Sequence, residues 1–243
     1  MTKESPARIW EIDFLRGLAI ILMVGYHLLY DLGDFVGLKK FLGFSTDLTT
    51  PAWLVAQHFF AGLFVILSGI SSNFSQNNFR RSLKYLAVAL VITAATYLFD
   101  PGSVVLFGII HCLGASVLIY GWLFRKSGPV TCLVSGISIA ALSALLPPLH
   151  RTLALSSNWL LPLGLHRPDF ASFDYFPLIP WFGVFLTGVA IGRWFYSTRK
   201  SLIRRALAET FINWCGRHSL WIYLAHQPII LGLLYLFGYL TLH

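Results

Sequence analysis

The sequence contains few charged residues. Among its 243 residues, 12% are Asp, Glu, Lys or Arg, whereas about one quarter of a soluble domain is charged. Hydrophobic residues make up 56% of the chain, and the mean hydropathy is +0.70. These values exclude an ordinary soluble domain and predict an integral membrane protein.

Cysteine is also scarce. Cys112, Cys132 and Cys215 all lie in or beside apolar runs, which excludes a disulfide scaffold and predicts buried free thiols. No small-residue cleavage site follows the first apolar run, so we expect no removable signal peptide. The sequence has no internal repeat and no H-E-x-x-H motif, and we expect no metal ion.

Acidic residues are outnumbered by basic ones, and the net charge is +8. The lysines and arginines gather in alternate short loops, as the topology of membrane proteins requires. We therefore expect no nucleic-acid partner. The same bias predicts a cytoplasmic N-terminus and an external C-terminus.

Long apolar runs are abundant, and a spanning helix needs about 20 such residues. They predict seven membrane spans, at residues 9–32, 52–72, 83–99, 103–124, 129–149, 174–196 and 215–239. The expected fold is an all-α polytopic bundle forming a single domain over residues 1–243. Residues 198–213 mix basic and apolar residues and predict an interfacial helix. Residues 152–165 are apolar but too short to span, so whether they enter the membrane stays open.

The first predicted span, "RGLAIILMVGYHLLYDL", contains three ionisable residues. Arg16 and His27 are eleven residues apart, which on an α-helix is about 16 Å of rise with an offset of about 20°. Asp31 follows His27 by one turn, so all three share a face. Ionisable groups inside a membrane are costly and face a protein interior or a watery cavity. Two simpler interpretations stay open: Arg16 as an anchor at the membrane surface, and His27 as a polar contact between helices.

Three histidines from three predicted spans lie at similar depths. His27, His58 and His111 fall about 6, 9 and 12 Å below the outer ends of their helices, and His226 lies nearer the middle of the last span. One buried histidine is common, but four in a small bundle predict a reactive or metal-binding chamber, and a site of four histidines around a metal ion stays the less favoured alternative.

Several segments resemble a known family. "EIDFLRGLAIILMVGYHLLYDL" is similar to the first helix of the transmembrane acyltransferases, in which an arginine, ten residues and a histidine open the catalytic domain; Arg16 and His27 have that spacing. "FVILSGISS" resembles the aromatic-x-x-Ser-Gly signature of these proteins, with Val65 where a second phenylalanine is often found. "FGIIHCLGAS", "DYFPLIPWFGVFLTGVAIG" and "GRHSLWIYLAHQPII" resemble the bacterial branch related to heparan-α-glucosaminide N-acetyltransferase. The resemblance extends from about residue 8 to residue 232.

This resemblance implies an activity. The expected reaction moves an acyl group, usually acetyl, from cytoplasmic acyl-CoA to a sugar hydroxyl or amine of a glycan, glycolipid or cell-envelope component on the opposite face. The co-substrate is then acyl-CoA, the partners are this acceptor and the lipid bilayer, and the expected location is a bacterial inner membrane. Whether the protein forms a homo-oligomer stays open.

Acyl transfer needs a base for the proton of the acceptor. A neutral imidazole suits this task, and His27 is the predicted base, with Asp31 to orient its ring. His111, His58 or Ser68 is expected to stabilise the developing oxyanion. A direct transfer and an acyl-histidine intermediate both stay open.

The two substrates need different side chains at opposite ends of the bundle. The phosphates of acyl-CoA suit arginine and lysine, and the predicted donor-binding residues are Arg16, Ser68, Arg80, Arg81 and Lys84. The predicted acceptor-binding residues are Trp159, Asp174, Tyr175 and His226. Anchoring at the membrane interface is an alternative for Trp159 and Tyr175.

Two other functions fit the composition. Buried histidines and a proline-interrupted last span also suit a small proton-coupled secondary transporter. A non-catalytic scaffold would use the same histidines only for packing. Only an enzyme releases free CoA from acyl-CoA.

Overall fold

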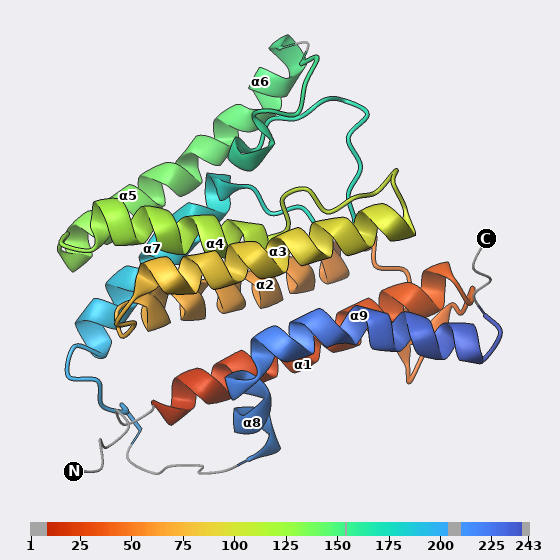
Figure 1. The fold of residues 1–243 in the computed structure, drawn as a ribbon, viewed down its shortest axis with the longest axis horizontal. Coiled ribbons are helices and arrows are strands. Elements are labelled where there is room, and N and C mark those ends of the chain that lie inside the picture. The colour runs from red at the N-terminus through yellow and green to blue at the C-terminus, as the bar shows by residue number, and fades with distance from the viewer. Residues whose placement is uncertain (1–8, 154, 204–209, 240–243) are drawn as a thin grey trace. The chain divides into compact units, whose positions relative to one another are not determined.

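The computed structural model describes residues 9–153, 155–203 and 210–239, and these residues are mainly helical (Figure 1). The α-helices are α1 (Trp10–Asp34), α2 (Pro51–Ser72), α3 (Asn78–Phe99), α4 (Ile109–Ile119), α5 (Pro129–Leu142), α6 (Leu146–Thr152), α7 (Leu178–Phe195), α8 (Phe211–Arg217) and α9 (Ser219–Leu236). A π-helical turn, Tyr120–Phe124, extends α4, and 3-10 turns occupy Ser143–Leu145 and Leu161–Leu163. A small antiparallel hairpin joins β1 (Lys40–Phe41) to β2 (Phe44–Ser45).

The predicted all-α membrane architecture is confirmed. In the described part of the chain, six helices are long and apolar enough to cross a membrane. They are Trp10–Asp34, Pro51–Ser72, Asn78–Phe99, Pro129–Thr152, Leu178–Phe195 and Ser219–Leu236. The predicted span at 103–124 is present as a shorter apolar helix, Ile109–Phe124. The orientation in the membrane stays a prediction.

Backbone hydrogen bonds explain why the helix Ile109–Phe124 starts later than residue 103, where the predicted span begins. The N–H of Phe173 donates to the carbonyl of Ser103 at 3.0 Å, and that of Phe176 donates to Phe107, also at 3.0 Å. Carbonyls in residues 103–107 therefore accept hydrogen bonds from a neighbouring segment instead of from a following helical turn. For the same reason, α7 begins after the segment that the sequence assigned to the start of span 174–196.

Two further predicted segments differ from the structure. The expected interfacial helix at 198–213 includes residues 204–209, which lie outside the described residues, and helix α8 begins only at Phe211. In the segment 152–165, Thr152 is the last residue of α6, and the described residues after it include one further helical element, the 3-10 turn Leu161–Leu163. The peptide bond Ile179–Pro180 at the start of α7 is cis.

The chain divides into two compact units. The terminal unit comprises residues 1–64 and 203–243, and the central unit comprises residues 65–202. Helix α2 contributes its first part to the terminal unit and its last part to the central unit. That the whole chain acts as one domain stays a prediction.

In the terminal unit, α8 and α9 both pack on α1 (Figure 1). Helices α1 and α8 meet at glycines. A Cβ atom on Gly17 would collide with the backbone carbonyl of Ile212, and one on Gly216 would collide with that of Asp13. Such close backbone contact is a main source of helix association in lipid, where the hydrophobic effect between helices is weak.

The central unit has a similar close contact between α5 and α7. A Cβ atom on Gly136 would lie 2.7 Å from the carbonyl oxygen of Gly183. Helices α3 and α4 are joined by a hydrogen bond, in which the buried hydroxyl of Ser82 donates to the carbonyl of Gly114 at 2.8 Å. Small residues and interhelical hydrogen bonds therefore hold these helices together.

We predict that Gly17→Ala destabilises the protein by about 1–3 kcal/mol, because the added methyl group meets a backbone carbonyl that cannot rotate away. The measurement is the temperature at which half of the detergent-solubilised protein stops eluting as a single species. Gly25→Ala is the matched control, since a Cβ atom there meets no atom within 4 Å. Equal loss in the two variants would show that helix α1 does not depend on this contact.

Candidate functional site

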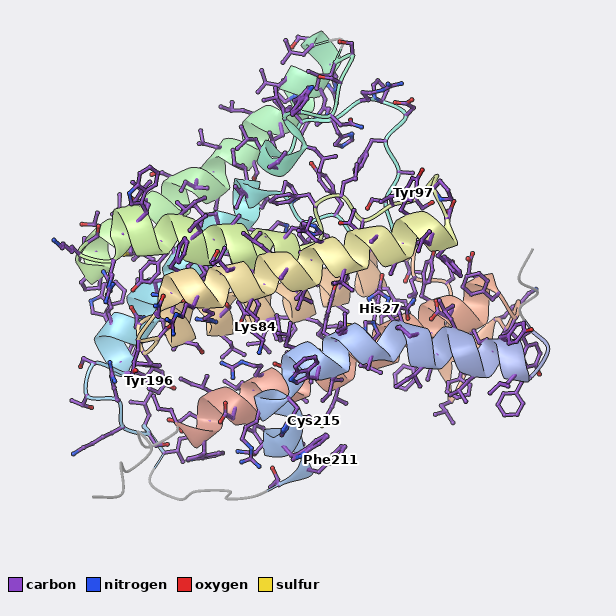
Figure 2. All side chains as sticks on the ribbon, viewed as in Figure 1. His27, Lys84, Tyr97, Tyr196, Phe211 and Cys215 are labelled. Atoms are coloured by element: carbon purple, nitrogen blue, oxygen red, sulfur yellow. The ribbon has the colours of Figure 1, made fainter. Side chains whose placement is uncertain are left out.

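Two histidines meet inside the terminal unit. His27 lies on α1 (Figure 2), and His226 lies on α9. Their ring centroids are 5.0 Å apart. His27 is half-buried and His226 is 8% exposed. The structure therefore joins the predicted base to a residue that the sequence assigned to acceptor binding.

The hydrogen bond of His226 fixes its tautomer. Its Nδ1 lies 2.6 Å from the carbonyl oxygen of Tyr223, and because a carbonyl only accepts, Nδ1 carries the proton. The Nε2 atom therefore has a lone pair. It is buried and has no hydrogen-bond partner among the described residues. His226 thus holds an oriented, unused basic nitrogen beside His27.

Asp31 contacts a different residue from the one predicted. Its carboxylate accepts a hydrogen bond of 3.4 Å from the side-chain amide of Gln227. Among the described residues it forms no hydrogen bond with His27, so the expectation that Asp31 orients the ring of His27 is not supported. Gln227 belongs to α9. The carboxylate of Asp31 therefore bonds a side chain of the neighbouring helix and not the histidine one turn earlier on its own helix.

The carboxylate and amide are incompletely paired. Asp31 is 1% exposed, and neither its Oδ2 nor the Oε1 of Gln227 has a hydrogen-bond partner among the described residues. An unsatisfied buried polar group costs about 1–3 kcal/mol. Together with Nε2 of His226, three unsatisfied atoms therefore lie on neighbouring residues, which is typical of a site that binds a polar ligand.

Arg16 shares the face of His27. Helix α1 is unbroken from Trp10 to Asp34, so the predicted alignment of the two residues holds. The Nη1 atom of Arg16 lies 3.0 Å from a carboxylate oxygen of Asp13. The arginine side chain is 20% exposed, so it lies partly buried in the first two turns of the helix.

His58 lies on the part of α2 that belongs to the terminal unit. Its ring is exposed, and Nδ1 bonds the carbonyl of Leu54 in the same helix at 2.7 Å. The ring is thus held by its own helix, and an oxyanion role for His58 stays a prediction.

In the central unit, His111 is fully hydrogen-bonded. Its Nδ1 accepts from the backbone N–H of Gly108 at 3.2 Å. Its Nε2 lies 3.1 Å from the hydroxyl of Thr93, and this hydroxyl donates to the carbonyl of Val105 at 2.7 Å. Nε2 therefore carries the proton and donates to Thr93. Both nitrogens hold the start of α4 in place, so the geometry favours a structural role over catalysis.

The predicted acceptor residue Asp174 completes this helix start. Its carboxylate accepts the backbone N–H of Ile109 at 2.9 Å, which is one of the unpaired donors at the N-terminus of α4. The N-cap residue is Gly108, which has no side chain for this purpose. Asp174 thus supplies the missing cap from a distant part of the chain, and its contact with an acceptor stays a prediction.

The two aromatic acceptor candidates have different surroundings. The hydroxyl of Tyr175 donates to the carbonyl of Leu161 at 2.8 Å. Burial raises the pKa of Tyr175 to about 12, so the phenol stays protonated. Trp159 is 88% exposed, which fits the alternative of an interfacial anchor.

Two of the predicted donor-binding residues are joined in the central unit. The guanidinium of Arg81 donates to the hydroxyl of Ser68 at 3.0 Å and to that of Ser72 at 2.9 Å. It also donates to the phenol of Tyr85. All of these partners are neutral, and Arg81 forms no ion pair with another described residue. Its positive charge is therefore oriented but not neutralised, as a phosphate-binding group requires.

The neighbouring basic residues Arg80 and Lys84 are more exposed than Arg81. Arg80 and Lys84 are exposed on α3, and the backbone N–H of Arg80 donates to the side chain of Asn77, which caps that helix. Figure 2 shows Lys84 on the same helix. Contact of either side chain with acyl-CoA stays a prediction.

Sequence reasoning missed the role of Arg193. Its guanidinium, on α7, donates to the carbonyls of Phe124 and Arg125 at 3.0 Å each, and to the side chain of Asn73 at 3.2 Å. It also donates to the phenol of Tyr120 at 3.3 Å. The residue therefore bonds the carbonyls at the end of the π-helical turn, where Phe124 also accepts from the backbone N–H of Ser127 at 3.1 Å. The only signal in the sequence is an arginine at the end of an apolar run.

The structure groups the predicted residues by unit. Their positions place His27, Asp31 and His226 together in the terminal unit, and Ser68 and Arg81 together in the central unit. Over residues 9–153, 155–203 and 210–239, no group of three His, Cys, Asp or Glu side chains is arranged to hold a metal ion.

The fold and these residues define a polytopic membrane protein in which a buried histidine and a half-buried histidine meet between two helices. The family model described as heparan-alpha-glucosaminide N-acetyltransferase, catalytic, matches residues 8–228. The chain belongs to this family of membrane acetyltransferases. No curated protein and no solved structure shows significant similarity to it.

We predict that Asp174→Ala lowers the free energy of unfolding by about 1 kcal/mol, the usual cost of losing a helix cap. Asp174→Asn should lose less, because its amide oxygen can still accept the N–H of Ile109. Thermal unfolding measures both, with the exposed Asp34→Ala as control. Unchanged stability combined with a raised KM for the acceptor would instead support the role in acceptor binding.

Proposed function

We propose that this protein transfers an acyl group, most simply acetyl, from cytoplasmic acyl-CoA to a hydroxyl or amine of a sugar or cell-envelope acceptor on the opposite face of a bacterial inner membrane. The family implies a membrane acetyltransferase. The donor, the acceptor class and the residues that act are parts of the proposal.

The observation that carries it is the histidine pair. His27 and His226 are 5.0 Å apart, and Nε2 of His226 has a lone pair without a partner among the described residues. Two positive rings at this distance would repel each other. The pair therefore suits a group that takes up one proton during a reaction and releases it afterwards.

In the proposed reaction, one proton moves from the acceptor to His27 and then to the sulfur of CoA. The acceptor oxygen attacks the thioester carbonyl carbon while the imidazole of His27 takes the hydroxyl proton. The intermediate then collapses, the carbon–sulfur bond breaks, and the proton passes from His27 to the sulfur. The products are an ester, or an amide from an amine, and free CoA. The lone pair of His226 accepts a hydrogen bond from the acceptor and orients it.

Arg16 supports the donor end of the proposal. It lies about 16 Å along α1 from His27 and on the same face, which matches an extended thioester whose phosphates bind the guanidinium. Asp13, at 3.0 Å, orients the side chain. In the central unit, the hydrogen bonds of Arg81 to Ser68 and Ser72 make it a second candidate for phosphate binding.

We predict that His27→Ala abolishes acyl transfer and CoA release while the protein remains folded. Purified protein receives acetyl-CoA labelled in the acetyl group together with a membrane extract, and free CoA and labelled acceptor are both measured. His218→Gln is the matched control, because His218 belongs to the same unit and bonds only the carbonyl of Trp214 among the interactions seen for its ring nitrogens. Label retained on the protein without acceptor would favour an acyl-histidine over direct transfer.

Full activity of His27→Ala would contradict the assigned base. A proton-coupled transporter would give a different pattern. It would show pH-driven uptake into vesicles and no release of CoA by the wild-type protein.

We further predict that Arg16→Ala raises the KM for acyl-CoA by about tenfold, while turnover at saturation changes less, because the residue binds the donor in the ground and transition states alike. Arg16→Lys should raise the KM less than Arg16→Ala does, because lysine keeps the positive charge but lacks the paired N–H donors of the guanidinium. The measurement is initial rate against acyl-CoA concentration. An unchanged KM would leave Arg16 as a membrane anchor.

A further inference from the structure

A groove of about 570 Å³ opens at the C-terminal end of α3, within the central unit. One wall is a stripe of that helix formed by Leu90, Thr93, Ala94 and Tyr97, whose spacing places them on a single face. Figure 2 shows Tyr97 near the end of α3. Leu90 is 67% exposed and Tyr97 is 59% exposed, so this wall is accessible.

The groove extends from the apolar part of a membrane to its surface. Leu90 lies about 13 Å along the helix from its last residue, Phe99, and α3 is a candidate span. Leu90 is therefore at the depth of the lipid chains. The opposite end of the groove is lined by a polar loop, which includes Asn158, Arg167 and Asp169.

The polar end carries opposite charges that neutralise each other. Nε and Nη2 of Arg167 donate to the two carboxylate oxygens of Asp169 at 2.8 and 2.6 Å. The backbone N–H of Arg167 donates to the side-chain oxygen of Asn158 at 3.0 Å. These bonds lower the pKa of Asp169 and raise that of Arg167 from their ordinary values, so both stay ionised at neutral pH.

This arrangement favours a neutral ligand rich in hydroxyl groups. The ion pair has no net charge to attract a phosphate, yet it offers a carboxylate acceptor and further guanidinium donors. The amide N–H groups of Asn158 and the phenol of Tyr97 add hydrogen-bonding capacity, and the rings of Tyr97 and Phe170 add apolar surface. Sugars have both kinds of surface.

The groove wall is also connected to the start of α4. Thr93 lines the groove, and its hydroxyl accepts from Nε2 of His111 at 3.1 Å while donating to the carbonyl of Val105. The fully bonded histidine therefore fixes this part of the wall. A preformed site of this kind needs less ordering when a ligand binds.

We propose that the groove binds a glycolipid, with its neutral sugar headgroup at Asn158, Arg167 and Asp169 and its acyl chains along the apolar stripe of α3. A ligand that is polar at one end and apolar at the other matches the change in lining from Asp169 to Leu90. The inference rests on the proposed function only in naming this glycolipid as the acyl acceptor.

The test uses the full-length protein in lipid nanodiscs without acyl-CoA. The probes are a glucosyl diacylglycerol and a phosphatidylcholine that carry the same photoreactive acyl chain. Crosslinks are mapped by mass spectrometry, with excess methyl glucoside as a competitor in one arm. We expect the glycolipid to label the segment around Leu90 about tenfold more than the phosphatidylcholine does, and methyl glucoside to compete weakly.

Matched variants separate the groove from the rest of the helix surface. Leu90→Trp fills the apolar stripe and should reduce labelling about tenfold. Val91→Trp is the control, because Val91 is 57% exposed on the same helix but does not line the groove. Asp169→Asn should reduce the preference for the glycolipid over the phosphatidylcholine, because it breaks the ion pair.

Three results would overturn the proposal. Equal labelling by the two lipids would indicate ordinary bilayer contact, strong competition by methyl glucoside would indicate a soluble sugar as the ligand, and equal effects of the two tryptophan variants would exclude the groove. The readout is independent of the proposed reaction, because His27→Ala should still be labelled. Labelling of the groove, together with no CoA release in a separate assay that supplies acetyl-CoA, would retain the groove and reject the acyltransferase.

Discussion

Polar groups inside a membrane have no water to bond with, so each needs a partner in the protein. This constraint separates the buried histidines into two kinds. His111 has a partner for each ring nitrogen, and it holds the start of α4. His226 has a partner for one nitrogen only, and its Nε2 is buried beside the ring of His27. The same residue type thus has two bonded ring nitrogens in the central unit and one unbonded ring nitrogen in the terminal unit.

The position of the available pair depends on backbone packing. Helices in lipid gain little from the hydrophobic effect, and small residues allow the close contact that holds them. Gly17 meets α8 one residue after Arg16, so the contact fixes the rotation of α1 close to the cation. Because the helix continues without interruption, it fixes the direction of His27 as well. A local contact between glycines thereby sets the geometry of two groups about 16 Å apart.

Helical periodicity is sufficient to predict which residues of one helix share a face. The shared face of Arg16 and His27 follows from their spacing alone. The partner of Asp31 does not, because Gln227 lies 196 residues further along the chain. The carboxylate of Asp174 likewise caps a helix that begins 65 residues earlier in the chain, and its contact with the acceptor stays a prediction. Such contacts depend on how the helices pack against one another, and the spacing of residues along one helix does not contain that information.

The two ends of α3 differ in charge in a way that favours two different ligands. Near its start, Arg81 has only neutral partners, so its charge is available to an anion. Near its end, Arg167 is paired with Asp169, so the groove beside Tyr97 suits a neutral molecule. Arg81 and Tyr97 are about 24 Å apart along the helix, which is most of the hydrocarbon thickness of a bilayer. An anionic donor and a neutral lipid-linked acceptor would therefore approach from opposite faces, and neither would compete for the other's site.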